Sequence, residues 1–325
     1  AELNEDVTKL SDMDKIKQQN SELLPRNSAF GTDFSNLDWR NNICVGVDEE
    51  GCGVKFKNLQ TMLRFAPPYH VLACLIQKNM STVLQAILCF LFDEKEFRKA
   101  NRNFSQEYLP VTFCSRKNQY NGVGEAEELM DLVHYNMTDW LHLAIVRDPI
   151  DRFLSGYVDK CVKEPHSPED YCNGCKWNMT CFIITEYEKI MNYSFSDLIS
   201  TSFEDRHFFP QTWYERCNFK TEIERYKFVH YSSAPQYAEK FREDLLDILR
   251  SQKIPEESLQ FIKDQLKGGR TVHSTVTSDF RVFYEERLKS SPFLLEYVIR
   301  MFYWDYRIFG FELPNVQNDV ARVTP

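Results

Sequence analysis

The sequence predicts an α/β fold in which a mostly parallel β-sheet is flanked by helices. Two segments share one pattern, in which a short continuous apolar run is followed by a polar turn and then by a helix-like run. The two apolar runs cover residues 70–76 and 141–146, and a third such run covers residues 226–231. Unbroken apolar runs of this length are typical of strands covered on both faces, and strands that alternate with helices predict parallel pairing.

Length and composition agree with a folded domain. The chain has 325 residues, of which 43% are hydrophobic and 14% aromatic, and this content is too high for a disordered chain. Its formal net charge of −9 argues against a general nucleic-acid-binding protein, which is normally basic. The longest apolar stretch, residues 71–92, is interrupted by Gln77, Lys78 and Asn79, so it does not predict a membrane-spanning helix.

The first 40 residues are polar and differ from the rest of the chain. Val7, Leu10, Met13 and Ile16 recur at every third position, which predicts a weak amphipathic helix. We interpret residues 1–40 as a stem or leader and residues 41–325 as one domain, although a helix packed on the domain fits the pattern equally well. The first residues lack the features of a signal peptide, so we expect either a cytosolic protein or a chain that begins after a removed signal or anchor.

The first strand–turn–helix unit predicts an anion-binding turn. Residues 77–80 separate the strand from a buried helix over residues 83–92, for which Ser81 or its neighbour is the N-cap. Unpaired N–H groups and the helix dipole favour an anion there, and Lys78, Ser81 and Thr82 add a charge and hydroxyl donors. No glycine lies between residues 76 and 122, so this is not the nucleotide triphosphatase loop. A capped helix with a solvated lysine is the alternative.

The second unit predicts a phosphate site of another kind. Asp148 is a natural N-cap and Pro149 fits the first helical position, so a helix is expected over residues 150–160. Arg147 ends the strand and Ser155 lies in the second helical turn, while Arg152 can pair with Asp148. An arginine that only caps the sheet edge through an ion pair is the alternative. Both turns follow the carboxyl ends of strands, so one ligand with two anionic ends could bridge them.

The later helices are predicted from apolar residues at helical spacing. After the third strand, one helix is expected to bury a face made of Tyr237, Phe241, Leu245, Ile248 and Leu249. A loop follows over residues 268–278, and the last helix begins at Ser291 and Pro292. Its inward side chains are expected to be Leu294, Tyr297, Val298 and Met301.

Ten cysteines and five N-x-S/T sequons favour a protein of the secretory lumen. The sequons begin at Asn79, Asn103, Asn136, Asn178 and Asn192. We interpret residues 161–200 as a Cys-rich helical insertion, whose cysteines are Cys161, Cys172, Cys175 and Cys181. These four could pair as disulfides or bind zinc, and a lumenal setting favours disulfides.

Five segments resemble membrane-bound Golgi carbohydrate sulfotransferases. Residues 147–157, RDPIDRFLSGY, match the family's 3′-phosphate loop at every fixed position. Residues 78–82, KNMST, are similar to its 5′-phosphosulfate loop in the lysine-led form of the chondroitin 4-O- and HNK-1-type enzymes. Residues 205–217, 273–278 and 303–311 resemble its histidine-led segment, its Ser/Thr-rich nucleotide loop and its closing aromatic stretch. The resemblance covers about residues 70 to 313, and the segments follow the family's order.

Three features depart from the family's pattern. Gln85 stands where the 5′ loop usually carries another lysine, and Phe208 replaces the tryptophan after the histidine. The four-cysteine segment at residues 161–181 is similar to invertebrate branches of the family rather than to vertebrate members.

The resemblance implies a P-loop-like sulfotransferase fold and an activity. A sulfuryl group would pass by in-line displacement from 3′-phosphoadenosine 5′-phosphosulfate to a hydroxyl of a glycosaminoglycan or glycoprotein glycan, without a metal ion. Lys78 would neutralise the leaving phosphate and His207 would be the general base, although a structural histidine is equally expected, and His134 and Glu204 are further candidates for the base. The donor-binding residues would be Lys78, Asn79, Met80, Ser81, Thr82, Arg147, Ser155, Ser274 and Thr275.

The resemblance also implies a setting and partners. It implies a glycan acceptor, no nucleic acid, and the Golgi lumen or secretion, with membrane attachment only through an N-terminal anchor outside this chain. Asn79 lies in the donor loop, so we expect this sequon to be unglycosylated. Two alternatives stay open. The first is a non-catalytic glycan-binding protein on the same fold, which Gln85 favours. The second is a cytosolic sulfotransferase for small hydroxyl compounds, which reduced cysteines would favour.

Overall fold

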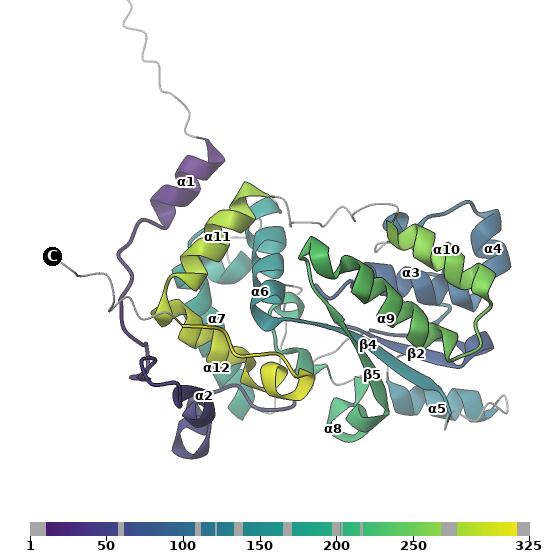
Figure 1. The fold of residues 1–325 in the computed structure, drawn as a ribbon, viewed down its shortest axis with the longest axis horizontal. Coiled ribbons are helices and arrows are strands. Elements are labelled where there is room, and N and C mark those ends of the chain that lie inside the picture. The colour runs from purple at the N-terminus through teal and green to yellow at the C-terminus, as the bar shows by residue number, and fades with distance from the viewer. Residues whose placement is uncertain are drawn as a thin grey trace, which may run out of the picture.

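A five-stranded mixed sheet forms the centre of the described chain, in the order β3-β1-β2-β4-β5 (Figure 1). The computed structural model describes residues 11–57, 62–107, 112–120, 122–132, 139–164, 171–196, 202, 204–214, 217–267 and 278–316. The strands are β1 (Met62–Ala66), β2 (Val71–Leu75), β3 (Gln119–Tyr120), β4 (Leu141–Arg147) and β5 (Tyr226–Tyr231). The predicted α/β class is confirmed.

The three predicted strands form the parallel part of the sheet. β2 pairs with β4 and β4 with β5, both in parallel, in registers that set Val71 opposite Leu141 and Arg147 opposite Tyr231. β1 and β3 were not predicted, and both pairings of β1 are antiparallel. Because β2 and β4 run side by side, their carboxyl ends reach the same edge of the sheet.

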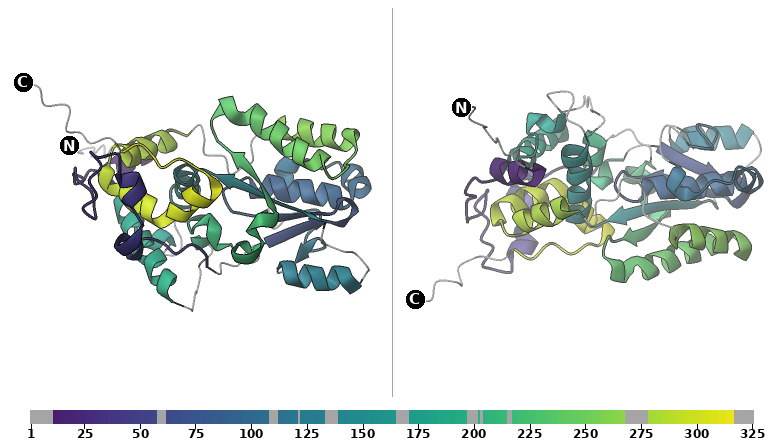
Figure 2. Two further views of the ribbon diagram at one scale, coloured as in Figure 1. Left: turned by 60° about the horizontal axis from the view of Figure 1, so that its bottom comes forward. Right: turned by 90° about the horizontal axis from the view of Figure 1, so that it is seen from above.

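Helices cover the sheet, and a further group of helices lies beyond one end of it. They are α1 (Asp12–Gln19), α2 (Trp39–Asn42), α3 (Ser81–Phe92), α4 (Glu94–Lys99), α5 (Val123–Leu132), α6 (Pro149–Tyr157), α7 (Met179–Phe195), α8 (Phe219–Glu222), α9 (Ala238–Arg250), α10 (Glu256–Lys267), α11 (Asp279–Lys289) and α12 (Pro292–Phe309). In Figure 2, α9 and α10 lie on one side of the sheet and α5 on the other. Figure 1 shows α6, α7, α11 and α12 gathered beyond the end of β4.

Alternation along the strands divides the core into two parts. Ala73 of β2 and Ile145 of β4 belong to a cluster with α3, α9 and α10. Their neighbours Cys74 and Val146 belong to the cluster that contains α6, α7 and α12. Neighbouring strand residues point to opposite faces, so both faces of the parallel strands are buried, as their unbroken apolar sequences predict.

All ten cysteines form disulfides. The pairs are Cys44–Cys52, Cys74–Cys217, Cys89–Cys114, Cys161–Cys172 and Cys175–Cys181. The zinc alternative for the four cysteines of residues 161–181 is therefore wrong, because each sulfur is already bonded. Helix α7, whose first turn contains Cys181, packs against α12 in the core.

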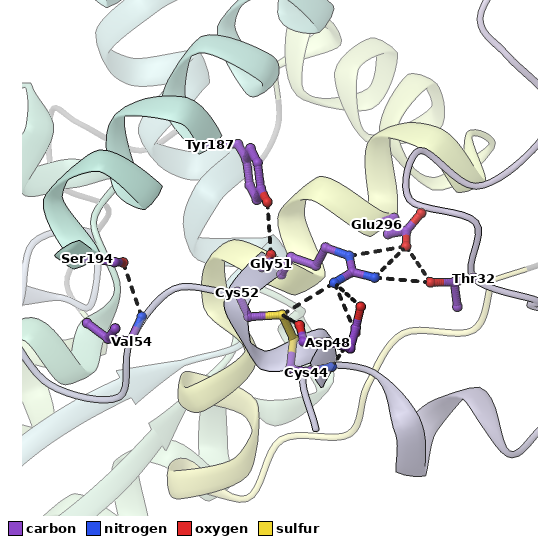
Figure 3. The surroundings of a disulfide bond; sticks show 10 residues. Thr32, Cys44, Asp48, Gly51, Cys52, Val54, Tyr187, Ser194 and Glu296 are labelled. Carbon is purple, nitrogen blue, oxygen red and sulfur yellow. Dashed lines mark hydrogen bonds and ion pairs between the residues drawn. A yellow bond between two sulfur atoms is a disulfide. The ribbon is translucent and has the colours of Figure 1, made fainter. Parts of the chain in front are cut away.

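The described part of the N-terminal segment packs against the body. Ile16 is fully buried, and Nδ2 of Asn20 donates to the carbonyl of Trp177 at 2.8 Å. Further along, Glu296 of α12 accepts a hydrogen bond from the hydroxyl of Thr32 at 2.5 Å (Figure 3). These contacts match the packed alternative for this segment, and the domain boundary at residue 41 stays a prediction.

The helical faces agree with the sequence except at Tyr237. Phe241, Leu245 and Leu249 of α9 are buried, as predicted. Tyr237 is 53% exposed, so its placement on the buried face is wrong. It lies in a short 3₁₀ turn, Pro235–Tyr237, before α9 begins, and the helical spacing does not extend to it.

Candidate functional site

The two predicted anion-binding turns meet at the carboxyl ends of β2 and β4. The guanidinium of Arg147 donates from Nη1 to the backbone carbonyl of Lys78 at 2.8 Å. Gln211 bonds to both turns, because its Oε1 accepts from the Arg147 backbone N–H at 3.1 Å and from Nδ2 of Asn79 at 2.5 Å. The turns are thus joined directly and through one shared side chain.

The first turn has a compact backbone that leads into α3. Lys78 and Met80 have φ values of 67° and 58°, in the left-handed region, and Met80 is the residue before the first helical position. Helix α3 therefore begins at Ser81, which is its first residue rather than its N-cap; the N-cap position is taken by the neighbouring Met80, without a side-chain hydrogen bond. Ser81 and Thr82 are half-buried in the first helical turn, where backbone N–H groups have no intrahelical acceptor.

Asn79 supports this turn from beneath. Its side chain is 1% exposed, and Nδ2 donates to the carbonyl of Ile145 in β4 at 3.0 Å. An amide nitrogen used in this way inside the core is closed to a glycan. Any contact between Asn79 and a donor would therefore run through the backbone.

The second turn is organised around Asp151. The Nε of Arg147 lies 2.8 Å from its carboxylate, NH2 of Arg281 lies 2.6 Å from it, and the hydroxyl of Ser233 donates to it at 2.7 Å. Burial alone would raise the pKa of Asp151, but the two guanidinium groups hold it well below its usual range. Asp148 caps α6 by accepting from the Asp151 backbone N–H at 2.9 Å, as predicted.

Arg152 differs from the sequence prediction. It does not pair with Asp148, but donates to the carbonyl of Gln77 at 3.0 Å and to that of Phe209 at 2.8 Å. Arg152 is 1% exposed, and it links the first turn to the segment that carries His207. Ser155, one helical turn further along, is buried at 5% exposure.

Lys78 lies in a buried ion pair. Its Nζ is 3.0 Å from Oδ2 of Asp159, and both side chains are less than a tenth exposed. Burial lowers the pKa of Lys78 to about 8; Asp159 opposes this shift, while Lys160 and Arg147 add to it. A lysine with this pKa is mostly charged at neutral pH and responds to a nearby anion.

His207 belongs to the same cluster. It ends the 3₁₀ turn Asp205–His207 and is 7% exposed. Burial lowers the pKa of His207 well below its ordinary value, and the ammonium groups of Lys78 and Lys160 lower it further. The imidazole is therefore neutral at physiological pH.

Gly156 allows the His207 segment to approach α6. A Cβ atom at Gly156 would lie 3.0 Å from Cε1 of Phe208 and 3.1 Å from the carbonyl oxygen of His207. Such contacts are tighter than ordinary van der Waals packing, so a side chain at this position would require the His207 segment to shift by a few tenths of an ångström. Glu204, another candidate for the base, precedes this turn and is half-buried.

Three predicted candidates lie outside the described residues. They are Ser274 and Thr275 of the nucleotide loop and the alternative base His134. Residues of α11, which follows the nucleotide loop, are described. Arg281 brings that helix to Asp151 and thus beside Arg147.

Sequence reasoning missed Asp159, Gln211 and Arg281. Gln211 lies inside the histidine-led segment, and the buried carboxylate of Asp305 accepts from its backbone N–H at 2.8 Å. Both residues lie in quoted segments of the resemblance, and no role was given to them. Asp159 follows Ser155 by four residues on the same helical run, and this spacing is the signal that could have found it.

Two other places were considered as sites. Cys44, Asp48 and Cys52 bring three metal-type ligands together, but the sulfurs form a disulfide and Asp48 pairs with Arg300 at 3.0 Å (Figure 3). An open pocket of about 420 Å³ lies at the amino end of β4 beside Trp140. It is at the opposite end of the strands from the two turns.

Comparisons with known proteins give consistent results. The profile described as "Sulfotransferase family" matches residues 61–312. An uncharacterised protein of Caenorhabditis elegans is 38% identical over 93% of this chain and 81% of its own length. A protein of the same worm that is provisionally named as a sulfotransferase, vep-2, is 38% identical over 73% of this chain and 72% of its own length. The worm carbohydrate sulfotransferase chst-1 is 30% identical over 79% of this chain and 77% of its own length.

No solved structure matches the chain. Within the described residues, the helices are all too short or too polar to cross a membrane.

Proposed function

This chain belongs to the sulfotransferase family, and on that premise we propose that it transfers a sulfuryl group from 3′-phosphoadenosine 5′-phosphosulfate to a hydroxyl of a carbohydrate. The observation that carries the proposal is the hydrogen bond from Arg147 to the Lys78 carbonyl. Because this bond joins two turns suited to anions, a single ligand with two anionic ends can reach both.

The donor has anionic ends of the required kind. Its 5′-phosphosulfate would lie at the first turn of α3, near Ser81 and Thr82, and its 3′-phosphate near Arg147 and Ser155. The Arg147 guanidinium is held by Asp151 and lies over the ring of Tyr231, with 5.1 Å to the ring centroid. A guanidinium fixed in this way is preorganised for a phosphate monoester.

Lys78 and His207 have the chemistry that the transfer needs. In-line displacement places negative charge on the leaving phosphate, and the Lys78 ammonium would neutralise it. The acceptor hydroxyl must lose a proton as it attacks. His207 is neutral, so its imidazole has an unprotonated nitrogen that can accept that proton, and its lowered pKa makes it a weaker base than an ordinary histidine.

We further propose that the acceptor is a glycan and that the protein acts in the secretory pathway. The name of the worm relative chst-1 supports a carbohydrate acceptor. The five disulfides favour the Golgi lumen or secretion over a reducing compartment. For the same reason, the alternative of a cytosolic enzyme for small hydroxyl compounds is disfavoured.

Labelled donor offered with a panel of desulfated glycosaminoglycans and other glycans tests this function. We expect label in one class of glycan, and its loss in Lys78→Ala and Arg147→Ala, since each removes a charge at one end of the donor. Sugar binding without turnover would favour the glycan-binding alternative. Binding of ATP with magnesium but not of adenosine 3′,5′-bisphosphate would contradict the proposal.

A further inference from the structure

A group of buried charged side chains lies beside the first turn. It contains more charged residues than the proposed transfer uses. Asp159 and Lys160 lie in the π-helical turn Val158–Lys163 that follows α6, and each is 5% exposed. The Nζ of Lys78 is 3.0 Å and the Nζ of Lys160 is 3.3 Å from the same atom, Oδ2 of Asp159. One carboxylate oxygen therefore holds two ammonium groups at the end of β2.

The charges of this cluster favour an anionic ligand. Two buried ammonium groups share Asp159, and Arg147 lies close enough to lower the pKa of Lys78 further. Glu164 pairs with Lys160 from a half-buried position. Each lysine therefore has a carboxylate partner in the unliganded protein, and one oxygen of Asp159 is shared between them at 3.0 and 3.3 Å. Phosphate oxygens placed between the two ammonium groups would accept charge-assisted hydrogen bonds from both.

Helix α3, which begins in the first turn, carries no charged side chain. Its Gln85 is buried and bonds to neighbouring residues. Its Oε1 accepts from NH2 of Arg64 at 3.2 Å, and its Nε2 donates to the Glu107 carbonyl at 3.2 Å. Helix α3 therefore supplies no second charge at this position. Lys160 reaches the same cluster from the π-helical turn that follows α6.

The surrounding structure fixes Lys160 in place. The next residue, Cys161, forms a disulfide with Cys172. The hydroxyl of Tyr171 donates to Glu164 at 2.7 Å, so the carboxylate that pairs with Lys160 is itself held. π-Helical turns are rare and often occur at functional sites. This one directs Asp159 and Lys160 toward Lys78.

We propose that Lys160 is a second donor-binding ammonium group, and that Asp159 is a positioning residue that holds Lys160 and Lys78 for the phosphosulfate end of the nucleotide. This inference rests on the proposed function, since it takes the anion to be the 5′ end of the donor. Oxygen atoms of the donor take over contacts that Asp159 makes in the unliganded protein. The pair of lysines is then the counterpart of Arg147 at the other end of the ligand.

Two ligands that differ only at the 5′ position test the role of Lys160. Lys160→Met should weaken binding of adenosine 3′,5′-bisphosphate roughly 10- to 100-fold, the loss of a charge-assisted hydrogen bond. Binding of adenosine 3′-phosphate should stay within about twofold, because that ligand lacks the 5′ group. Lys160→Arg, which keeps the charge, should retain most of the affinity. Lys163→Met, at an exposed position of the same turn, is the matched control.

The outcomes separate this inference from the proposed function. An equal loss for both ligands, or no loss in Lys160→Met, overturns the role of Lys160. If the unaltered protein binds neither ligand, the proposed function fails first. Thermal unfolding of each variant shows whether it is folded, and Lys160→Gln, which also removes the charge, replaces the methionine variant if that one does not fold.

The pH profile of binding tests the role of Asp159. Among the residues that the structure describes, the charged and titratable groups that act on Lys78 are Asp159, Lys160, Arg147 and His207. Asp159→Asn removes the one anion among them, so the pH at which bisphosphate affinity begins to fall should move down. A profile that coincides with that of the unaltered protein would overturn the positioning role, because a purely structural aspartate would change stability and leave this pH unchanged.

Discussion

Raising the pH should weaken binding of adenosine 3′,5′-bisphosphate, because Lys78 loses its proton. Burial lowers the pKa of Lys78 from 10.5 to about 8 in the unliganded protein. A phosphate bound beside it favours the ammonium form and raises that pKa again. Between these two values the complex holds more protons than the free protein, so affinity must fall as the pH rises.

The size of the effect follows from the shift. If the ligand restores the ordinary pKa, affinity falls about tenfold per pH unit above pH 8, or roughly 3 kcal/mol in all. Below pH 8 the curve should be flat until the phosphate groups themselves take up protons, near a pKa of about 6. The contribution of Lys78 to folding has the opposite sign. The lowered pKa of Lys78 destabilises the unliganded fold below about pH 8, and this cost is lost as the pH rises from about 8 to 10.5, because the unfolded chain binds more protons in that window.

Isothermal titration calorimetry from pH 6.5 to 9.5 at constant ionic strength measures this directly. Lys78→Arg is the control, because a guanidinium keeps its charge over the whole range. Its affinity should not fall in this window, whatever its absolute value. An unaltered protein whose affinity is constant to pH 9.5, or increases, would refute the reasoning about Lys78.

Three other changes have defined outcomes. Gly156→Ala should lower kcat by moving the segment of His207 while changing bisphosphate affinity little; an unchanged kcat would show that this close contact does not matter. Asp151→Asn should reduce the free energy of unfolding by about 3 kcal/mol in urea denaturation and weaken bisphosphate binding, since two buried guanidinium groups lose their partner; full stability would contradict the ion-pair account. Replacing Cys74 and Cys217 by serine should reduce the free energy of unfolding by about 2–5 kcal/mol, because the bond spans 143 residues, and calorimetric melting that shows no loss would count against it.

The sequence predicted the parallel strands and both turns because their signals are local. Unbroken apolar runs mark β2 and β4, and Asp148 followed by Pro149 marks the start of α6. Strand β1 was not predicted because Arg64 interrupts its apolar run. That arginine is buried and donates to the Ser115 carbonyl at 2.6 Å and to Oδ1 of Asn118 at 3.0 Å. These partners are distant in sequence, so no local pattern shows them.

The same distinction applies to the candidate site, where some features can be predicted from the sequence and others depend on the tertiary fold. The positions of Lys78 and Arg147 follow from strand ends that a sequence displays. The contacts that hold them come from Gln211, Arg281 and Asp159, which only the tertiary fold brings together. The groups with which a buried arginine pairs also depend on the tertiary fold and cannot be predicted from the local sequence.

A crystal structure of the protein with adenosine 3′,5′-bisphosphate is the most direct test of the central claim that one nucleotide spans the two joined turns. We expect the 3′-phosphate within hydrogen-bond distance of the Arg147 guanidinium, and the 5′-phosphate at the first turn of α3 beside Lys78. A nucleotide that touches only one of these residues, or that binds in the pocket beside Trp140, would contradict the account.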